Sequence, residues 1–571
     1  MKLQLSKPKI YALAAILSIA LFSCNKIFET TSEDVLSPDK YYKTINDANN
    51  AVLGVYSQLF DIANKYIILN EVRADLIDVT ENADIDLIAL NEHRVDKTNK
   101  YANPSDFYKI INNCNDVINN LKLMYKNLFI TKEQFEERYS DIMAIRCWLY
   151  WQLGVHYGTV PYITKPFENF NDIKSIDNYP SYKFDQLLDT LVETMKNLPT
   201  LNNYITFPPV NLNGNNMANG GWFDKKFFMA ELFLWDGQYY EAAKIYRTLI
   251  EPAPAGFEVY NWHRMCALNA YGGETTYTFN QIFSAIPTSN LFRNEFVWVL
   301  LFDYRYNQIN TFVDLFAIEG GKYLLKPSQV SIDNWSLFPS GPNYDQRGLG
   351  FSWTMQNGKP VVYKHILEYQ PNSSEKPGKW WIYRQSSIHL HYAEAVNRLN
   401  HEYLAWILVN NGMPNYNLNK GVLVNNVLRS YKDTAFMQTL EPFPYDLSGL
   451  PTSITQRQTI DGYVYPSGNL LRNVGVRGRA AVSVINVPDS VNGQPVDSML
   501  FIEDLIIDES AREIGYEGHR WPDLLRIALR RNDPNFIANR VAEKFVRKND
   551  NATAEAVRNK LASGDWFLPL P

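Results

Sequence analysis

Acidic and basic side chains alternate in residues 505–531, "LIIDESAREIGYEGHRWPDLLRIALRR". Five of them recur at helical spacing and so share one helix face: Glu509, Arg512, Glu513, Glu517 and Arg520. Paired carboxylates could perform acid–base chemistry, and Glu513, Glu517 and His519 could bind a metal. The arginines between the acids favour a structural ion-pair network, and the His-Glu-x-x-His spacing of metalloproteases is missing. We therefore predict no catalytic residue and no metal site.

Hydrogen-bonding side chains are dense in residues 69–93, which show no clear helical period. Arg73, Asp75, Asn91 and His93 supply donors and acceptors that could hold a polar ligand. The alternative is a segment whose charges pair with one another while it packs on the helices or on a partner. The four residues are predicted ligand contacts, and both interpretations stay open.

Aromatic residues make up 14% of the chain, with 36 Tyr, 30 Phe and 13 Trp. Such rings can fill helix interfaces, or they can stack on sugar rings and on peptide side chains. Those that flank irregular segments are candidate platforms: Trp222, Trp262, Tyr304, Tyr306, Trp335 and Trp353. From them we select Trp222, Tyr304 and Trp335 as predicted ligand contacts. Trp298 lies inside the apolar run "FVWVLLF" and is expected in the core.

The first 24 residues have the features of an export signal that ends at a cysteine. Three lysines precede an apolar run of about 13 residues at 10–22, which is shorter than the roughly 20 needed to span a bilayer. The run ends in Leu-Phe-Ser-Cys, and a thiol at a new N-terminus can carry diacylglycerol. We predict a signal peptide at 1–23, lipidation of Cys24 and a tether at 24–40. An uncleaved anchor or a chance cysteine is the alternative.

Charge and the remaining cysteines exclude several classes of function. The net charge is −6 and the sequence has no basic run, so nucleic acid is not an expected partner. Cys114, Cys147 and Cys266 are odd in number and lack the spacing of metal ligands. Cys114 and Cys147 fall in apolar helical patterns, where a thiol is usually a core residue. No cofactor, metal or disulfide framework is predicted.

Apolar side chains at steps of three and four predict helices early in the chain. One stripe runs from Tyr41 to Leu59 after the start signal Ser37-Pro38-Asp39, and others cover 107–121 and 142–153, the last ending at Gly158. Residues 223–250 form two helices around Trp235-Asp236-Gly237, like one tetratricopeptide (TPR) unit. No clean 34-residue repeat surrounds it, and an ordinary helix pair is equally compatible.

The middle of the chain is irregular and rich in Asn, Gly, Pro and aromatic residues. Strands are predicted at 296–302 and 359–367, and helices at 382–399 and 501–531, where Asp523 is expected to cap a second helix. Long insertions lie near 330–380 and 410–498. We predict a mainly α body at 41–571 with a helical part at 41–250, a loop-rich ligand-facing part at 251–380 and a C-terminal helical part with an insertion at 381–571.

Several segments in order carry a family resemblance: 24–29, 41–56, 107–118, 144–163, 384–400, 503–526 and 566–571. In these segments the chain resembles the SusD/RagB family of nutrient-binding outer-membrane lipoproteins of Bacteroidetes. The most recognisable is "EDLIIDESAREIGYEGHRWPDLLR", and the segments span nearly the whole mature chain. The resemblance implies a SusD-like α-helical fold with TPR-like helix pairs and large aromatic loops.

The resemblance also implies a function without bond chemistry. The protein would be a lipid-anchored, surface-exposed lid on a SusC-like TonB-dependent transporter of the outer membrane, and it would capture an oligosaccharide or a peptide. The alternatives are a surface glycan-degrading enzyme, which needs two suitably spaced carboxylates such as Asp303 and Asp333, and a TPR-like interaction scaffold. The resemblance transfers no specific ligand contact, because members differ most in these loops.

Overall fold

The computed structural model describes residues 42–167, 179–201, 221–250, 279–337, 345–410 and 474–570, with small gaps at 287–288, 290–291, 293–294 and 372. Only isolated short pieces are described between 411 and 473. The predicted signal peptide, Cys24, the tether at 24–40, Trp262 and Cys266 therefore lie outside the described residues, as does most of the 410–498 insertion.

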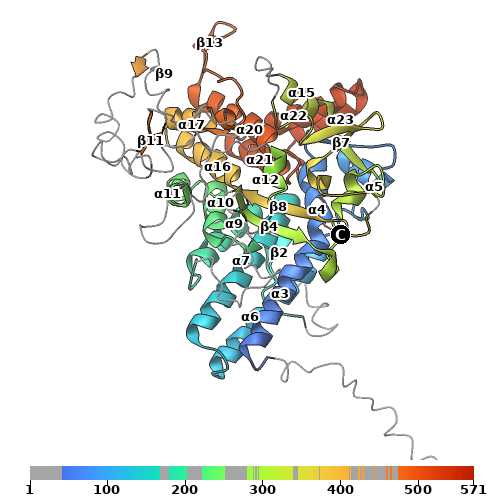
Figure 1. Ribbon diagram of the computed structural model, residues 1–571, viewed down its shortest axis with the longest axis vertical. Coiled ribbons are helices and arrows are strands. Elements are labelled where there is room, and N and C mark those ends of the chain that lie inside the picture. Colours follow the sequence, from blue (N-terminus) through green and yellow to red (C-terminus); the bar gives the residue numbers. More distant parts are fainter. Residues whose placement is uncertain are drawn as a thin grey trace, which may run out of the picture.

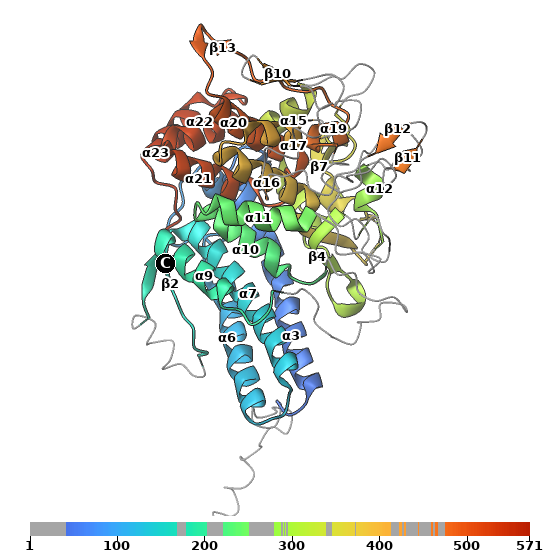
Figure 2. The ribbon, with the colours of Figure 1, turned by 90° about the vertical axis from the view of Figure 1, so that its left-hand side faces the viewer.

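Three long helices form the lower half of the molecule (Figures 1 and 2). They are α3 (Ile45–Leu59), α6 (Ser105–Lys126) and α7 (Lys132–Tyr157), and α6 runs antiparallel to the other two. The predicted stripes form their buried faces, including Cys114 and Cys147, whose thiol pKa values burial raises to about 12. α7 ends at Gly158, which has a φ of 70°. The three predicted helices are confirmed.

The start of α3 differs from the prediction. The helix begins at Ile45, and Thr44 caps it by accepting a hydrogen bond from the Asp47 N–H at 3.3 Å, while Asp47 accepts from the Thr44 N–H at 2.7 Å. This reciprocal capping box satisfies N–H groups at the first turn, so the apolar stripe alone placed the start too early.

A second layer of helices crosses the upper end of this bundle (Figure 2). α10 (Lys225–Trp235) and α11 (Tyr239–Ile250) form the predicted helix pair, with Gly237 at a φ of 75° in their turn. α9 (Phe184–Lys196) packs beside α7 and α10, and α16 (Gln385–Arg398) packs on α11 and on α17 (Glu402–Val409).

The C-terminal helices lie on top of this layer (Figure 1). They are α20 (Ser498–Glu513), α21 (Arg520–Arg531), α22 (Pro534–Val546) and α23 (Asn551–Ala562). The predicted helical region at 501–531 is thus two helices. Asp523 does not cap the second one: it lies in the first turn of α21 and accepts hydrogen bonds from Ser510 Oγ and Arg526 Nη2, both at 2.8 Å.

Strands occur only as antiparallel pairs in the described part of the chain. The longest pair joins β4 (Phe296–Phe302) to β8 (Gly378–Arg384). The others are β1 (Ile77–Val79) with β5 (Leu325–Pro327), β2 (Thr159–Pro161) with β3 (Ser181–Lys183), β6 (Trp353–Gln356) with β7 (Lys359–Val362), β9 (Val422–Val424) with β10 (Val427–Arg429), β11 (Gln458–Ile460) with β12 (Tyr463–Tyr465), and β13 (Ser490–Val491) with β14 (Gln494–Pro495).

Short elements replace several segments that were predicted to be irregular or extended. Residues 69–93 hold part of a π-helical turn η2, strand β1 and helix α5, and the predicted strand at 359–367 ends early in the 3₁₀ turn η6. The short helical elements are η1 (Phe60–Ile62), α4 (Ala63–Ile67), η2 (Ile68–Val72), α5 (Ile85–Asn91), α12 (Phe279–Phe283), η5 (Tyr304–Tyr306), α14 (Phe312–Phe316), α15 (Gln329–Ser336), η6 (Lys364–Ile366) and α19 (Val476–Arg479).

No helix in the described ranges has both the length and the apolar character needed to cross a membrane.

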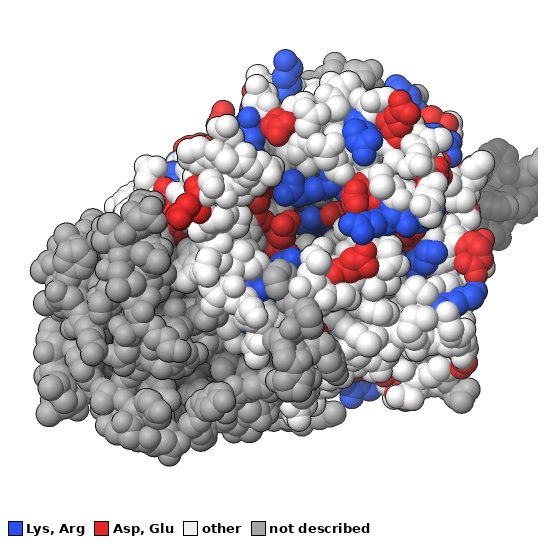
Figure 3. Space-filling model, turned by 90° about the horizontal axis from the view of Figure 1, so that it is seen from above, with Lys and Arg blue, Asp and Glu red and all other residues white. Residues whose placement is uncertain are grey.

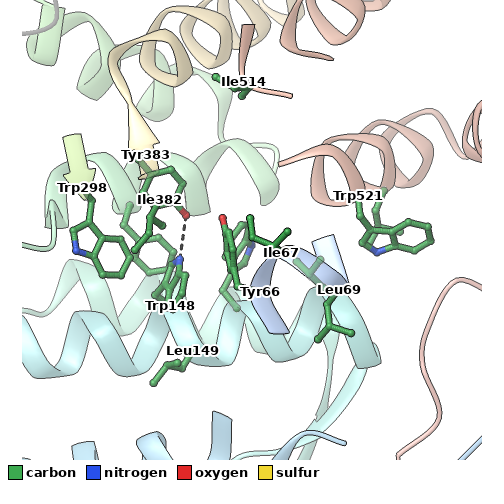
Figure 4. Close-up of a cluster of buried hydrophobic side chains, with 14 of the residues drawn as sticks. Tyr66, Ile67, Leu69, Trp148, Leu149, Trp298, Ile382, Tyr383, Ile514 and Trp521 are labelled. Carbon is green, nitrogen blue, oxygen red and sulfur yellow. Dashed lines mark hydrogen bonds between the residues drawn. The ribbon is translucent and has the colours of Figure 1, made fainter. Parts of the chain in front are cut away.

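Aromatic side chains from distant segments meet in the main core (Figure 4). Trp148 on α7 donates a hydrogen bond from Nε1 to the Tyr383 hydroxyl on β8 at 3.2 Å. Trp298 of β4 packs edge-on against Trp148 with 5.1 Å between ring centroids. Tyr66 of α4 stacks on Trp148 with 5.8 Å between ring centroids. The prediction that Trp298 is a core residue is confirmed.

The end of the described chain packs on the end of α7. The Leu568 N–H donates to the carbonyl of His156 at 2.8 Å, and the Phe567 ring lies against Gly158. A Cβ at residue 158 would come within 2.7 Å of that ring. A glycine is therefore needed both for the positive φ and for the close approach.

Glu71 satisfies the N-terminus of α21 from a segment far away in sequence. Its buried Oε1 accepts the backbone N–H groups of Gly518 at 2.7 Å and His519 at 3.1 Å, whereas Oε2 has no hydrogen-bond partner among the described residues. Burial raises the pKa of Glu71 to about 8, and these N–H donors offset only part of the rise. The contacts fit a protonated side chain whose carbonyl oxygen caps the helix.

This assignment predicts a pH dependence for the stability of Glu71→Gln. The folded protein holds a proton that the unfolded chain releases between pH 4.5 and 8, so the free energy of unfolding falls as pH rises through that window. Glutamine keeps the acceptor oxygen but does not titrate. In the variant, the free energy of unfolding should therefore no longer fall by the roughly 1.4 kcal/mol per pH unit that one released proton contributes. Urea unfolding across the window measures this slope. Glu543→Gln, on the exposed side of α22, is the control, and parallel curves for wild type and Glu71→Gln would contradict the assignment.

Candidate ligand-binding surface

The turn that follows β4 is held in shape by its own side chains. Asp303 accepts a hydrogen bond from the Arg305 N–H at 3.0 Å and pairs with the Arg305 guanidinium, with 2.9 Å between Nε and Oδ1. These contacts close the 3₁₀ turn η5, and Asn307 ends it with a φ of 58°. Asn tolerates this left-handed conformation better than most residues, so the sequence Asp-Tyr-Arg-Tyr-Asn determines the turn locally.

The same turn exposes two aromatic rings. Tyr304 is 47% and Tyr306 61% accessible, and Ile309 beside them is also exposed. A hydrogen bond to Glu375 and the negative charge of that carboxylate raise the pKa of Tyr304, so a carboxylate lies beside the Tyr304 hydroxyl. Residues 303–309 and Glu375 form what we call the tyrosine surface. Its rings can stack on apolar ligand faces while the neighbouring polar groups form hydrogen bonds.

The tyrosine surface stands on a rigid base. Asn310 is buried at the end of the turn and donates from Nδ2 to the His365 carbonyl at 2.9 Å. Gly378, opposite Phe302 in the β4–β8 pair, leaves room for this amide, because a Cβ there would lie 2.3 Å from Nδ2. Gln308 Nε2 donates to Ser57 Oγ of α3 at 2.9 Å and joins the turn to the helical bundle, beside which it lies in Figure 2. Such anchoring lowers the entropy cost of binding.

Two of the three selected aromatic residues are packed inside the protein. Trp335 of α15 is buried, donates from Nε1 to the Arg512 carbonyl at 3.2 Å and lies against Gly348. Trp222 is buried and meets Tyr56 edge-on at 5.1 Å. Their role in ligand binding stays a prediction, while Tyr304 is the selected residue whose ring reaches solvent.

Arg73 and Asp75 are buried and bind other protein groups. The Arg73 guanidinium lies 3.9 Å over the Trp521 ring and donates to the backbone carbonyl of Trp566. Asp75 receives two hydrogen bonds from the Arg520 guanidinium, at 2.7 and 2.8 Å. Both residues thus hold α21 and the C-terminal segment on the segment before β1, as the structural alternative expects.

Asn91 and His93 are also buried in protein contacts. Asn91 Oδ1 accepts from Lys544 Nζ at 2.7 Å, and the same ammonium donates to the carbonyls of Val72 and Ala74 at 2.9 and 2.7 Å. His93 Nε2 lies 2.8 Å from the Arg73 carbonyl. The ligand role of these four residues therefore stays a prediction, and we do not include them in the proposed surface.

The charged residues of 505–531 form the predicted ion-pair network with partners from other segments. Glu509 lies 2.6 Å from both Arg347 and Arg477, measured to their Nη1 atoms. Glu517 binds Arg384 Nε at 2.8 Å and Lys364 Nζ at 2.7 Å. These contacts confirm that the acids form ion pairs, although the partners are mostly not the neighbouring arginines of the same helix.

The electrostatics of this network are unsuited to acid–base catalysis. Burial alone would raise the pKa of Glu509, but Arg347, Arg477 and Arg512 outweigh it and lower the pKa to about 2. Arg384 and Lys364 do the same for Glu517, whose pKa is also about 2. A general acid or base works best with a pKa near the ambient pH. Both groups remain permanently ionised at neutral pH.

Other candidate carboxylates are engaged in surface ion pairs. Asp303 binds Arg305 within its own turn, and Asp333 of α15 lies 3.4 Å from Arg547 Nη1. Over the part of the chain that the structure describes, no group of three or more His, Cys, Asp and Glu side chains could hold a metal ion.

The upper face of the molecule is hollowed at its centre, and acidic and basic side chains lie next to one another there (Figure 3). α20, α21 and α22, which lie at this end, carry partly exposed pairs such as Asp504 with Arg531 Nη2 at 3.0 Å and with Arg540 Nη2 at 3.3 Å. The carboxylate of Asp508 is half exposed and lies 3.9 Å from Arg540 Nη2. Among the described residues of α20, α21 and α22, no aromatic side chain is exposed as Tyr304 and Tyr306 are.

Several parts of the tyrosine surface were missed from sequence. Gln308, Asn310 and Glu375 had no assigned role, and Tyr306 was named as a platform but not selected. A local signal was present, because Asp303 directly follows the strand and Asn307 comes four residues later, and both residue types favour turns. Glu375 had no such signal: it lies some 70 residues further along the chain.

Comparisons with known proteins support the fold. No protein-family model matches the chain. A SusD-like protein, P25, from Formosa agariphila is 25% identical over 166 residues, which are 26% of this chain and 30% of that relative. A SusD superfamily structure from Bacteroides vulgatus gives a TM-score of 0.57 at 14% identity and covers 90% of this chain and 92% of its own. A laminarin-binding SusD-like protein gives 0.55 at 14% identity, covering 93% and 97%. The predicted mainly α, SusD-like fold is confirmed, and with it the resemblance to the SusD/RagB family.

Glu513→Ala tests the structural role of the ion-pair network. Glu513 accepts from Ser386 Oγ at 2.7 Å and lies 3.3 Å from Nη1 of both Arg384 and Arg347. Removing it leaves buried positive charge without compensation, and we expect a loss of about 3 kcal/mol of stability. Thermal and urea unfolding measure the loss, and Glu543→Ala, half-exposed on α22, should change it little. An unchanged melting temperature together with lost ligand binding would contradict the structural role.

Proposed function

We propose that this chain, which has the fold of the SusD superfamily, is a cell-surface lipoprotein that captures an oligosaccharide and delivers it, as a lid, to a SusC-like TonB-dependent transporter of the outer membrane. The observation that carries the proposal is the tyrosine surface, where Tyr304 and Tyr306 are exposed on a turn fixed by Asn310 and Gln308. Exposed aromatic rings on a rigid turn favour binding over a packing role.

A glycan is the ligand class that the comparisons favour over a peptide. One solved structure with this fold, covering nearly the whole chain, is of a laminarin-binding protein. Sugar rings present apolar C–H faces that stack on aromatic side chains, and their hydroxyls bind polar groups such as Asp303 and Glu375. A shallow surface of this kind should bind with dissociation constants of about 1 μM to 1 mM, and such binding permits release into a transporter.

Binding without cleavage is part of the proposal. Asp303 is held by Arg305 within the turn, and Glu509 and Glu517 are locked between buried cations. A glycoside hydrolase would need two carboxylates about 5 to 9.5 Å apart with free access to the scissile bond. The alternatives are still a surface glycan-degrading enzyme and an interaction scaffold, and each predicts a different experimental result.

Tyr304→Ala and Tyr306→Ala test the tyrosine surface. Each substitution removes one stacking ring and should weaken glycan binding about 5- to 150-fold, since a stacked ring contributes roughly 1–3 kcal/mol. Calorimetry with laminarin and a panel of other glycans measures the affinity. Tyr240→Ala on α11, where the ring is 44% accessible but far from the turn in sequence, is the matched control. Equal affinities for all variants would place the ligand elsewhere.

The same samples separate binding from turnover. Chromatography of the glycan after incubation should recover it intact; shorter products that persist after repurification of the protein would make the chain an enzyme. Loss of glycan uptake when a co-expressed SusC-like transporter is deleted would support the lid, and uptake that does not depend on such a transporter would favour the scaffold alternative.

Cys24→Ala tests the proposed lipid anchor. The export signal and the cysteine at its end motivate the anchor, and two or three acyl chains on one residue hold a protein stably on a membrane. We expect the variant to fold but to leave the membrane fraction. Cell fractionation with immunodetection shows this, with Cys114→Ala, a buried thiol on α6, as the control for loss of a cysteine. A Cys24→Ala protein that stays in the membrane pellet would contradict lipid anchoring.

A further inference from the structure

The lower end of the helical bundle exposes a group of apolar side chains. They lie where α6 ends and the chain turns into α7: Leu123, Tyr125, Leu128 and Phe129. We call this group the tip. Figures 1 and 2 show this end of α3 and α6 projecting downward, away from the upper layers.

Leu128 is the most exposed residue of the tip, at 86% accessibility, and packing does not account for it. Its backbone φ is 60°, and its N–H donates to the Tyr125 carbonyl at 3.1 Å, so it occupies the left-handed position that ends α6. Glycine or asparagine is usual at this position. Here a bulky apolar side chain takes this position and stands in solvent.

The tip also lies where the chain enters the described body. Lys43, the second described residue, places its ammonium 4.9 Å from the centre of the Phe129 ring. Cys24, the proposed lipid site, precedes Tyr42 by 18 residues. Such a segment spans at most about 60 Å when extended and about 25 Å on average as a flexible coil. Phe129 of the tip thus contacts a residue that follows Cys24 by only 19 positions in the chain.

We propose that the tip inserts into the lipid surface to which the protein is anchored. The proposal rests on the lipid anchoring proposed above. Two observations favour lipid over a protein partner: the tip lies at the end of the bundle that projects away from the upper layers, and exposed lysines such as Lys43 and Lys126 flank its apolar side chains. Aromatic rings and leucine with lysines around them are typical of side chains that enter a membrane interface. Insertion would fix the bundle end at the bilayer and so orient the body.

Vesicle binding by the unlipidated protein tests this proposal. The mature chain carrying Cys24→Ala is mixed with vesicles of phosphatidylethanolamine and phosphatidylglycerol, and the bound fraction is measured by co-sedimentation. The double substitution Leu128→Glu and Phe129→Glu should lower the partition coefficient about tenfold or more. It replaces two apolar side chains that would enter the membrane by charged ones. Ile85→Glu on α5, where Ile85 is 79% accessible, is the matched control and should bind like wild type.

A second measurement locates the contact even if the glutamate pair lowers stability. A polarity-sensitive dye on Leu128→Cys, with Cys266 replaced by Ser, should shift to the blue when vesicles are added, and the same dye on Ile85→Cys should not. Absence of vesicle binding by the parent chain, or equal shifts at both positions, would overturn the proposal. So would tip variants that keep vesicle binding but lose self-association or co-purification with a transporter. Failure of glycan binding in calorimetry leaves these results standing, so the two proposals fail separately.

Discussion

The rest of the structure depends on the ion pairs and hydrogen bonds of the buried Arg384 guanidinium. It ends β8, and from there it binds Glu517 beyond the end of α20, Glu295 before β4 and the backbone carbonyl of Glu513. One planar group with five donors can join three segments in fixed orientation, which a lysine could not. The acids that surround it are themselves shared with other arginines, so removal of any member leaves uncompensated charge in the interior.

This network explains how a mainly helical protein positions a small strand pair and the turn beside it. β8 ends at Arg384 and β4 begins directly after Glu295, and at the other end of the pair Phe302 and Gly378 lie beside Asn310, under the tyrosine surface. The network thus holds the far end of the seven-residue strand pair that carries the turn, while the turn itself is closed by its own residues. Rigid support of this kind suits a site that binds weakly and must release its ligand unchanged.

The two proposed functional surfaces lie on different parts of the molecule. The tyrosine surface lies beside α3 at the end of β4, while the tip lies at the free end of the bundle, where α6 turns into α7 (Figure 2). Their apolar side chains are exposed although the protein buries most of its other large rings. We assign binding to the tyrosine surface and to the tip for the same reason: both expose apolar side chains that contribute little to packing.

The sequence by itself determined the local features. Periodic apolar residues placed α3, α6 and α7, the run "FVWVLLF" placed β4, and acids and arginines at helical spacing indicated ion pairs, because all of these signals act between residues close in the chain. Only the tertiary structure decided the partners. Glu71 caps α21, Asp75 binds Arg520 and Trp335 is packed under Arg512, so residues that seemed free to bind a ligand are internal. Sequence spacing does not say which distant segment will occupy a donor or cover a ring, since that depends on how the whole chain packs.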